Sequence, residues 1–398
     1  MKRVLILTAA IAVVSFTAGL AVAAEYHVAN DLICYDCHTP HFSMQHGYEG
    51  GSAISPTPTV GGNWLGSSGP NEYLLKAPAN LICEQCHDGT NTAPDVVMQN
   101  TNSGVYVDGR EAGALNDTAG AAPYQTWKGH TLGTTDSPPG YDPTTVGAND
   151  HYDSSLGLEC INCHLNHGIA FAYRNLGPRS FAGSANRANF EPTYKIGPAQ
   201  PGPTDCDNGS STTPNPTSCD VWINIASGYV AGTGNAATFG PYYSAANINF
   251  LRQDAALGSV STSNRLGSFC AACHANFHGG PGDANIGGTG NPAEEFERHP
   301  TAQVSIGALG GGHSNLARYV AATTKVKVAT NDYTNFTSSS PLCVTCHKAH
   351  GNQNPFGLIF QNRDSTAVDE QGGLATGQVP GNDTGIRNLC GQCHVQGN

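Results

Sequence analysis

Long amphipathic patterns are rare in this 398-residue chain. Ser314 to Val326 is predicted to form a short helix, because Leu316, Tyr319 and Val320 recur near helical spacing. Ser314 is a suitable N-cap, since its hydroxyl can accept a hydrogen bond from a free N–H of the first turn. Thr301 to Ile306 and Val326 to Ala329 could form short strands, and the remainder is predicted to be coil.

The most apolar stretch lies at the N-terminus. Lys2 and Arg3 precede an almost wholly apolar run, and Ala21-Val22-Ala23 resembles a cleavage site. Residues 1–24 are therefore predicted to be a secretory signal peptide, cut after Ala23 or Ala24. A membrane anchor is the alternative, but the run is short and ends in small residues. We expect residues 25–398 to form a single exported unit with no transmembrane segment, because no later stretch approaches ~20 apolar residues.

The composition is poor in charge and rich in turn-forming residues. Charged residues make up 12% of the chain, against the roughly 25% that is usual. Gly and Pro together number 49 + 24 = 73, which favours turns and loops over long helices or sheets. The formal charge of −12 becomes −12 − 2 = −14 without Lys2 and Arg3, so nucleic acid is not the expected partner.

One five-residue motif, Cys-x-x-Cys-His, occurs six times. Its first cysteines are not evenly spaced, so the chain is not a solenoid of equal repeats. The copies are Cys34-x-x-Cys37-His38, Cys83-x-x-Cys86-His87, Cys160-x-x-Cys163-His164, Cys270-x-x-Cys273-His274, Cys343-x-x-Cys346-His347 and Cys390-x-x-Cys393-His394.

This motif is the attachment signature of c-type haem. Two thiols at this spacing can bind both vinyl groups of one porphyrin, and the adjoining His can bind the iron. A zinc site or a redox disulfide would not require that His. With 16 His in 398 residues, six chance matches have a probability on the order of 10⁻⁸. The sequence therefore predicts six covalently attached haem c groups.

Two cysteines, Cys206 and Cys219, remain outside the motifs. A disulfide between them would close a loop of about 14 residues and contribute about 3 kcal/mol. The loop between them has no large apolar residue with which to pack, so a covalent link is expected in an exported protein. Two free thiols are the alternative.

A coil-rich chain of this length would not ordinarily bury enough apolar surface to fold. Haem is a large apolar group, and burying six of them would supply the missing hydrophobic stabilisation. We therefore predict a fold of mostly coil with short helices and few strands, wrapped around a continuous haem stack. Each motif is expected on a helical turn, which brings both cysteines and the histidine to one side.

Ten histidines lie outside the motifs, enough to give every iron a second axial ligand. Iron with two His ligands is closed to substrate and suits electron transfer. A His three positions after a motif cannot easily reach its own iron, but can reach the next haem in a close stack. The candidate ligands after motifs are His41, His167, His278 and His350, the loop candidates are His130 and His299, and His27 lies shortly before the first motif. His46, His151 and His313 are predicted to be ordinary loop residues.

As a set, these motifs resemble those of OmcS-type hexahaem cytochromes, which metal-reducing bacteria secrete as conductive filaments. The resemblance covers the mature chain and depends on the six motifs together with seven accessory histidines in family-like contexts. Those contexts are Tyr26-His27, Thr39-Pro40-His41, Lys128-Gly129-His130, His167-Gly168, His278, Arg298-His299-Pro300 and Lys348-Ala349-His350. Cys206 and Cys219 have no counterpart in this pattern.

The resemblance implies bis-His haems in a continuous chain and a head-to-tail homopolymer. It further implies that His41 binds the fifth haem of a neighbouring subunit, whose motif histidine is His347. Seven accessory histidines are available for six places, so one is spare. The expected function is non-enzymatic electron transfer along an extracellular filament to external acceptors and other cytochromes. A monomeric periplasmic or surface carrier is the first alternative, and a multihaem reductase with one open iron is the second.

Overall fold

The fold is described from a computed structural model. It defines residues 34–38, 47–48, 52–53, 74–87, 96, 112–113, 115, 129–140, 157–167, 172–177, 192–197, 219–224, 247–252, 264–277, 299–301, 304–307, 314–321, 326–333, 335–351, 355–359 and 389–394. The signal peptide predicted over residues 1–24 lies outside these residues. Within the described ranges, no helix is both long and apolar enough to span a membrane.

Every described helix is short, as the scarcity of amphipathic patterns predicts. The α-helices are α2 (Cys34–Cys37), α3 (Ala79–His87), α6 (Arg265–Ala271), α7 (Leu316–Ala321) and α8 (Cys343–Cys346). The 3-10 helices are η3 (Cys160–Asn162), η4 (Tyr173–Asn175), η6 (Ala275–Phe277), η7 (Pro355–Gly357) and η8 (Cys390–Gln392). The strands are β1 (Gly47–Tyr48), β2 (Ser52–Ala53), β3 (Tyr194–Gly197), β4 (Val221–Asn224) and β5 (Ile248–Phe250).

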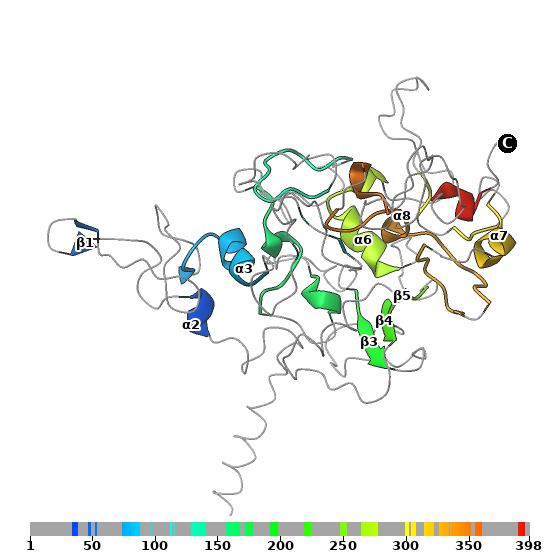
Figure 1. Ribbon diagram of the computed structural model, residues 1–398, viewed down its shortest axis with the longest axis horizontal. Helices are drawn as coiled ribbons and strands as arrows, with labels where there is room; N and C mark the ends of the chain where they lie inside the picture. Colours follow the sequence, from blue (N-terminus) through cyan, green and yellow to red (C-terminus); the bar gives the residue numbers. More distant parts are fainter. Residues whose placement is uncertain are drawn as a thin grey trace, which may run out of the picture.

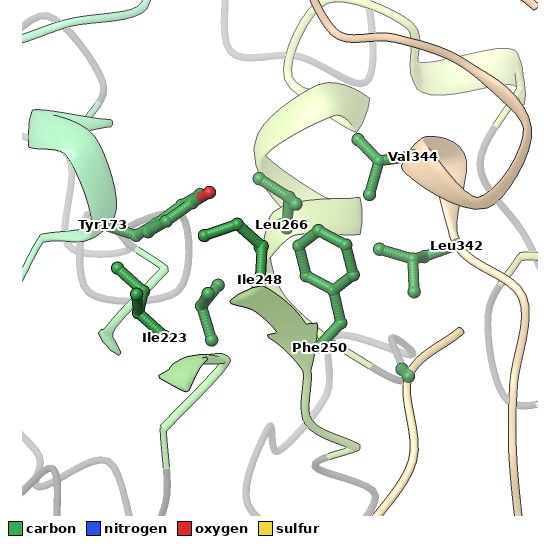
Figure 2. Packing of buried hydrophobic residues seen from close by; sticks show 9 residues of the cluster. Tyr173, Ile223, Ile248, Phe250, Leu266, Leu342 and Val344 are labelled. Atoms are coloured by element: carbon green, nitrogen blue, oxygen red, sulfur yellow. The ribbon is translucent and has the colours of Figure 1, made fainter. Parts of the chain in front are cut away.

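A three-stranded sheet provides the main apolar core. Its order is β3-β4-β5, with β3 parallel and β5 antiparallel to β4. Figure 2 shows side chains of this sheet packed against residues of the helices around it. Ile223 and Phe250 come from the strands, Leu266 from α6, and Leu342 and Val344 from the start of α8. The core therefore joins the helices of the fourth and fifth motifs to one sheet.

A buried ion pair stands beside this core. The Asp220 carboxylate, fully buried, lies 3.4 Å from the Arg265 guanidinium. It also accepts hydrogen bonds from the backbone N–H groups of Thr193 and Arg265. Burial raises the pKa of Asp220, while the charge of Arg265 and the N–H groups of Thr193 and Arg265 lower it. The network fixes the start of α6, which carries the fourth motif.

Two local predictions need correction. The helix α7 runs over Leu316–Ala321 and is shorter than the one predicted. Its first turn is capped by Asn315, whose side-chain oxygen accepts the Arg318 N–H at 3.2 Å. The predicted cap, Ser314, instead accepts the backbone N–H of Gly307 at 2.8 Å. An amide side chain one position later thus takes the role predicted for the hydroxyl.

The strands predicted in the C-terminal third are also wrong. The described residues of 301–306 and of 326–329 lie in no named strand. Ala329 forms only isolated bridges, to Phe250 and Ser340. This segment contributes Val326 and Val328 to a second core cluster, so their burial arises from tertiary packing rather than from a sheet.

Candidate cofactor-binding site

All six motifs lie on a helical turn, as predicted. They lie in or at the ends of α2, α3, η3, α6, α8 and η8. In five of them, the N–H of the motif His donates to the carbonyl of the first Cys over 2.8–3.0 Å. In the second motif the same residues close the helix α3. This shared turn brings the two thiols and the imidazole of each motif to the same side.

Consecutive motifs are neighbours in space. The thiols of Cys83 and Cys160 are hydrogen-bonded, which joins the second and third motifs. Those of Cys270 and Cys343 are likewise hydrogen-bonded, which joins the fourth and fifth. Figure 1 shows α2, α3, α6 and α8 following one another along the long axis of the molecule, with the last motif near α7.

At the other three junctions between consecutive motifs, a cysteine of one motif lies close enough to a cysteine of the next to affect its pKa. In each case burial is the main cause of a raised thiol pKa, and a cysteine of the adjoining motif adds to it. Cys83 acts on Cys37 (pKa about 11), Cys273 on Cys163 (pKa about 12) and Cys390 on Cys346 (pKa about 12). The six motifs therefore form one line in sequence order.

Four motif histidines each face a histidine from outside the motifs. The ring centres lie 5.9–6.1 Å apart, and in every case the two residues belong to distant segments. The pairs are His38 with His167 at 5.9 Å, His164 with His350 at 6.1 Å, His274 with His130 at 5.9 Å, and His394 with His299 at 5.9 Å.

This separation fits one metal ion between two imidazoles. A metal–nitrogen bond to His is about 2 Å and the ring centre lies roughly 1 Å further, so two opposed axial ligands have centres about 6 Å apart. Direct stacking of the two rings would instead bring their centres closer than this, near the lower end of the ~4.5–7 Å range of aromatic pairs. The four spacings cluster within 0.2 Å of one another.

Backbone carbonyls orient these rings. A carbonyl can only accept, so each ring below donates from Nδ1 and, when neutral, leaves Nε2 with the lone pair that binds metal. The motif rings are those of His164, His274 and His347, held by Arg174, Pro139 and Phe356 over 2.8–2.9 Å. The others are His130, held by Ala349 at 2.7 Å, and His299, held by Pro300 at 3.0 Å.

Burial keeps several of these imidazoles neutral. It lowers the pKa of His130 to about 4, with a further lowering by the charge of His274. Burial also lowers the pKa of His274, His299, His347 and His350. Neutral imidazole is the form that binds a metal, so these side chains are in the ligating state at pH 7.

The odd-numbered motifs share a feature that is not found at the even ones among the described residues. Downstream of each, a leucine forms an antiparallel bridge with the motif His: Leu75 with His38, Leu176 with His164, and Leu358 with His347. The residue after that leucine donates its backbone N–H to the carbonyl of the second motif Cys, over 2.8–3.1 Å. The residue before it has a positive φ, at Leu74, Asn175 and Gly357. We call this three-residue unit the leucine turn.

The leucine turn reveals a repeat that uneven motif spacing conceals. Each repeat comprises a loop His, an odd motif followed three residues later by a second His, and an even motif. The first runs through His27, the motif ending at His38, His41 and the motif ending at His87. The second and third run through His130, His164, His167 and His274, and through His299, His347, His350 and His394. The chain is thus three two-motif units in tandem.

The residues present fit haem better than zinc. In the described ranges no three His, Cys, Asp or Glu come together as a metal site. A haem iron needs only two protein ligands, because the porphyrin supplies the other four. A structural zinc site would need four protein ligands, whereas each facing pair supplies two imidazoles.

Some predicted site residues lie outside the described ranges. These are the candidate ligands His27, His41 and His278, and the histidines predicted to be ordinary, His46, His151 and His313. Cys219 is disulfide-bonded, as predicted, and all twelve motif cysteines are free. Cys206, its predicted partner, lies outside the described ranges.

Sequence reasoning found the ligating residue types but missed how they pair. His167 and His350 were expected to reach the next haem along the stack. Each instead faces the motif histidine two motifs earlier, His38 in one case and His164 in the other. The leucine turns were also missed, although a leucine follows each odd motif within the same unit.

The chain matches no known protein family, no curated protein and no solved structure.

Proposed function

We propose that this protein is a hexahaem c-type cytochrome that conducts electrons along a continuous line of haems and polymerises head to tail. The observation that carries the proposal is the set of four facing histidine pairs. Each pairs one motif histidine with one accessory histidine at the spacing that axial ligation of a single iron requires. Haem, when bound, supplies reversible one-electron chemistry.

The chain's residues favour electron transfer over catalysis. His38, His164, His274 and His394 each face a second imidazole, so both axial positions of those four irons would be filled by protein. Such irons have no place for a substrate. The backbone carbonyls on Nδ1 hold the rings fixed, which keeps reorganisation on gain or loss of an electron small. We propose no catalytic residue.

Two simple rules describe the observed pairs. The loop His of a unit faces the even motif of its own unit, as His130 faces His274 and His299 faces His394. The His that follows an odd motif faces the odd motif of the preceding unit, as His167 faces His38 and His350 faces His164.

Applied to the first unit, these rules assign the remaining ligands. His27, the loop His, would bind the iron of His87. His41 follows the first odd motif of the sequence, so the second rule directs it to a unit of another subunit. In a head-to-tail polymer the preceding unit is the third unit of the adjoining subunit, whose odd motif ends at His347. The family resemblance implies the same bond. His278 then has no role in the pattern and is the spare histidine.

The test is replacement of His41 by Ala, with His278→Ala as the matched control. We expect His41→Ala protein to carry six haems but to remain monomeric, with one iron high-spin. The His278→Ala protein should form filaments with every iron low-spin. Electron microscopy and the Soret and near-infrared spectra report the two properties. Long filaments of His41→Ala protein with six low-spin irons would contradict ligation between subunits, and a wild-type protein that never assembles would favour the monomeric carrier.

A further inference from the structure

Arg174 holds a positive charge beside the proposed ligands of the third iron. It immediately precedes the leucine turn of the second unit, has a φ of 52°, and its carbonyl accepts the Nδ1–H of His164 over 2.9 Å. Its guanidinium carbon lies 5.2 Å from the ring centre of Tyr173, a buried core residue. The Nε and Nη2 atoms of Arg174 are shielded from solvent. Backbone and side chain are thus both held against the third motif.

The charge of Arg174 also acts on the ring that faces His164. Burial, the neighbouring histidines and the charge of Arg174 together lower the pKa of His350. The ring centres of His350 and His164 lie 6.1 Å apart, so an iron held between them would be close to the guanidinium. Because salt screens a shielded charge much less than an exposed one, the effect of this charge should persist in solution.

A cation at this site favours the reduced form of the iron. Ferric haem carries one positive charge more than ferrous haem, so a nearby guanidinium destabilises the ferric form by Coulomb repulsion. The reduction potential of that haem therefore rises. When the axial ligands are the same, the surroundings of a haem are the means by which a protein adjusts this potential.

The residue before the leucine turn differs between units. In the third unit it is Phe356, which also has a positive φ, 58°, and accepts the Nδ1–H of its motif histidine, His347, over 2.8 Å. The backbone geometry of the two positions is the same, but a phenylalanine carries no charge. The second and third units therefore differ at this position by one positive charge.

We propose that the residue before the leucine turn sets the reduction potential of the odd-motif haem, and that Arg174 raises the potential of the third haem above that of the fifth. This inference rests on the proposed function and adds to it an energetic order along the line of haems. An electron on the line would reside on the third haem in preference to the fifth. The inference depends on the charge of Arg174 and not on which further groups its guanidinium contacts.

The matched variants are Arg174→Gln, which removes the charge, and Arg174→Lys, which retains it. Both are compared with wild type in a redox titration followed by electron paramagnetic resonance. At a fixed applied potential, Arg174→Gln should lower the ratio of reduced to oxidised third haem about tenfold, which is ~59 mV for a one-electron couple. Arg174→Lys should lower this ratio by much less, and the other five haems should be unaffected.

The orientation of the imidazoles identifies the signal of the third haem. The ring planes of His164 and His350 cross at 70°, and those at the sixth motif cross at 86°. At the first and fourth motifs the planes differ by only 27° and 33°. Crossed planes give a more anisotropic low-spin ferric signal than near-parallel planes do. One of the two strongly anisotropic signals should therefore move in Arg174→Gln protein.

Phe356→Arg tests the same position in the third unit. Because this side chain is 68% exposed, the new charge should raise the potential of the fifth haem by a smaller factor, measured at low ionic strength. If Arg174→Gln protein loses haem, this variant decides: an unchanged potential overturns the inference. Equal shifts in Arg174→Gln and Arg174→Lys, or six low-spin haems with no shift, would also overturn it and leave the proposed function standing. A wild-type protein with fewer than five haems would overturn both.

Discussion

The ring of His167 lies 5.9 Å, centre to centre, from the ring of His38, and the two planes differ by 27°. His38 ends the first motif, while His167 follows the third. Neither ring belongs to a segment that would bring it there by local folding. The pair therefore links two of the three units, and the pairing of His350 with His164 repeats the same link one unit later.

Loss of this link should affect one iron only. In His167→Ala protein we expect six attached haems, because the cysteines proposed to attach them are unchanged. The iron of the first motif should lose its second axial ligand and become high-spin, about one-sixth of the total, since a single histidine then remains. Electron paramagnetic resonance measures this fraction. A fully low-spin His167→Ala protein would contradict the pairing.

Gly129 should not tolerate a side chain, because it lies between two accessory histidines, His130 and His350. A Cβ there would lie 2.5 Å from the carbonyl oxygen of His350 and 2.6 Å from the Cα of Gly351. The adjoining His130 donates its backbone N–H to the same His350 carbonyl over 2.9 Å. Gly129→Ala should therefore displace both accessory histidines and leave up to two of six irons high-spin.

Gly307→Ala provides the control for backbone strain. Gly307 has a φ of +83°, so alanine is unfavourable there, but the nearest atom to a Cβ is 3.3 Å away. This variant should lose stability while its irons remain low-spin, as judged by thermal unfolding and by the same spectra. Equal spectral changes in both glycine variants would show that strain alone explains the Gly129 result.

The buried pair of Asp220 and Arg265 should dominate the stability of the small sheet. Asp220→Asn leaves the guanidinium, 5% exposed, without its counter-ion, which typically costs about 3–5 kcal/mol. Replacing both residues, Asp220→Asn with Arg265→Met, should recover part of the loss. The exposed Asp136→Asn should change the free energy of unfolding by no more than about 0.5 kcal/mol. Denaturant unfolding with the haems attached measures all three, and a double variant less stable than Asp220→Asn would argue against the ion pair.

The disulfide at Cys219 should matter for stability and not for haem attachment. Replacing Cys206 and Cys219 by Ser should lower the free energy of unfolding by about 3 kcal/mol, because the unfolded chain gains the freedom of a loop of about 14 residues. The haem count should remain six. Mass spectrometry of non-reduced peptides should show the link in the native protein, and alkylation of Cys219 there would exclude it.

Local features of the fold could be predicted from the sequence and non-local ones could not. The turn at each motif follows from the spacing of two cysteines and a histidine, and all six lie on helical turns. The ion pair of Asp220 and Arg265 could not be predicted in this way. Its contribution to stability depends on burial beside a sheet whose strands come from three separate segments. Val326 and Val328 alternate with a polar residue, as in a strand. Both are buried in a core cluster, but no described sheet contains them.

The candidate site divides in the same way. His130, His167, His299 and His350 could be chosen as ligands from their neighbours in the sequence, and each faces a motif histidine. Which histidine each would face depends on how whole units pack, and sequence intervals carry no such information. The repeat became visible only through the bridges of Leu75, Leu176 and Leu358, which lie at unequal distances from their motifs.

The most direct test of the account combines a haem count with a spin-state measurement on assembled wild-type protein. Pyridine haemochrome analysis should give six haems per chain. Electron paramagnetic resonance of the oxidised protein and resonance Raman spectroscopy of the reduced protein should show every iron low-spin, as two histidine ligands require. Fewer than five haems per chain, or a high-spin fraction near one in six in the assembled material, would contradict a continuous line of closed irons.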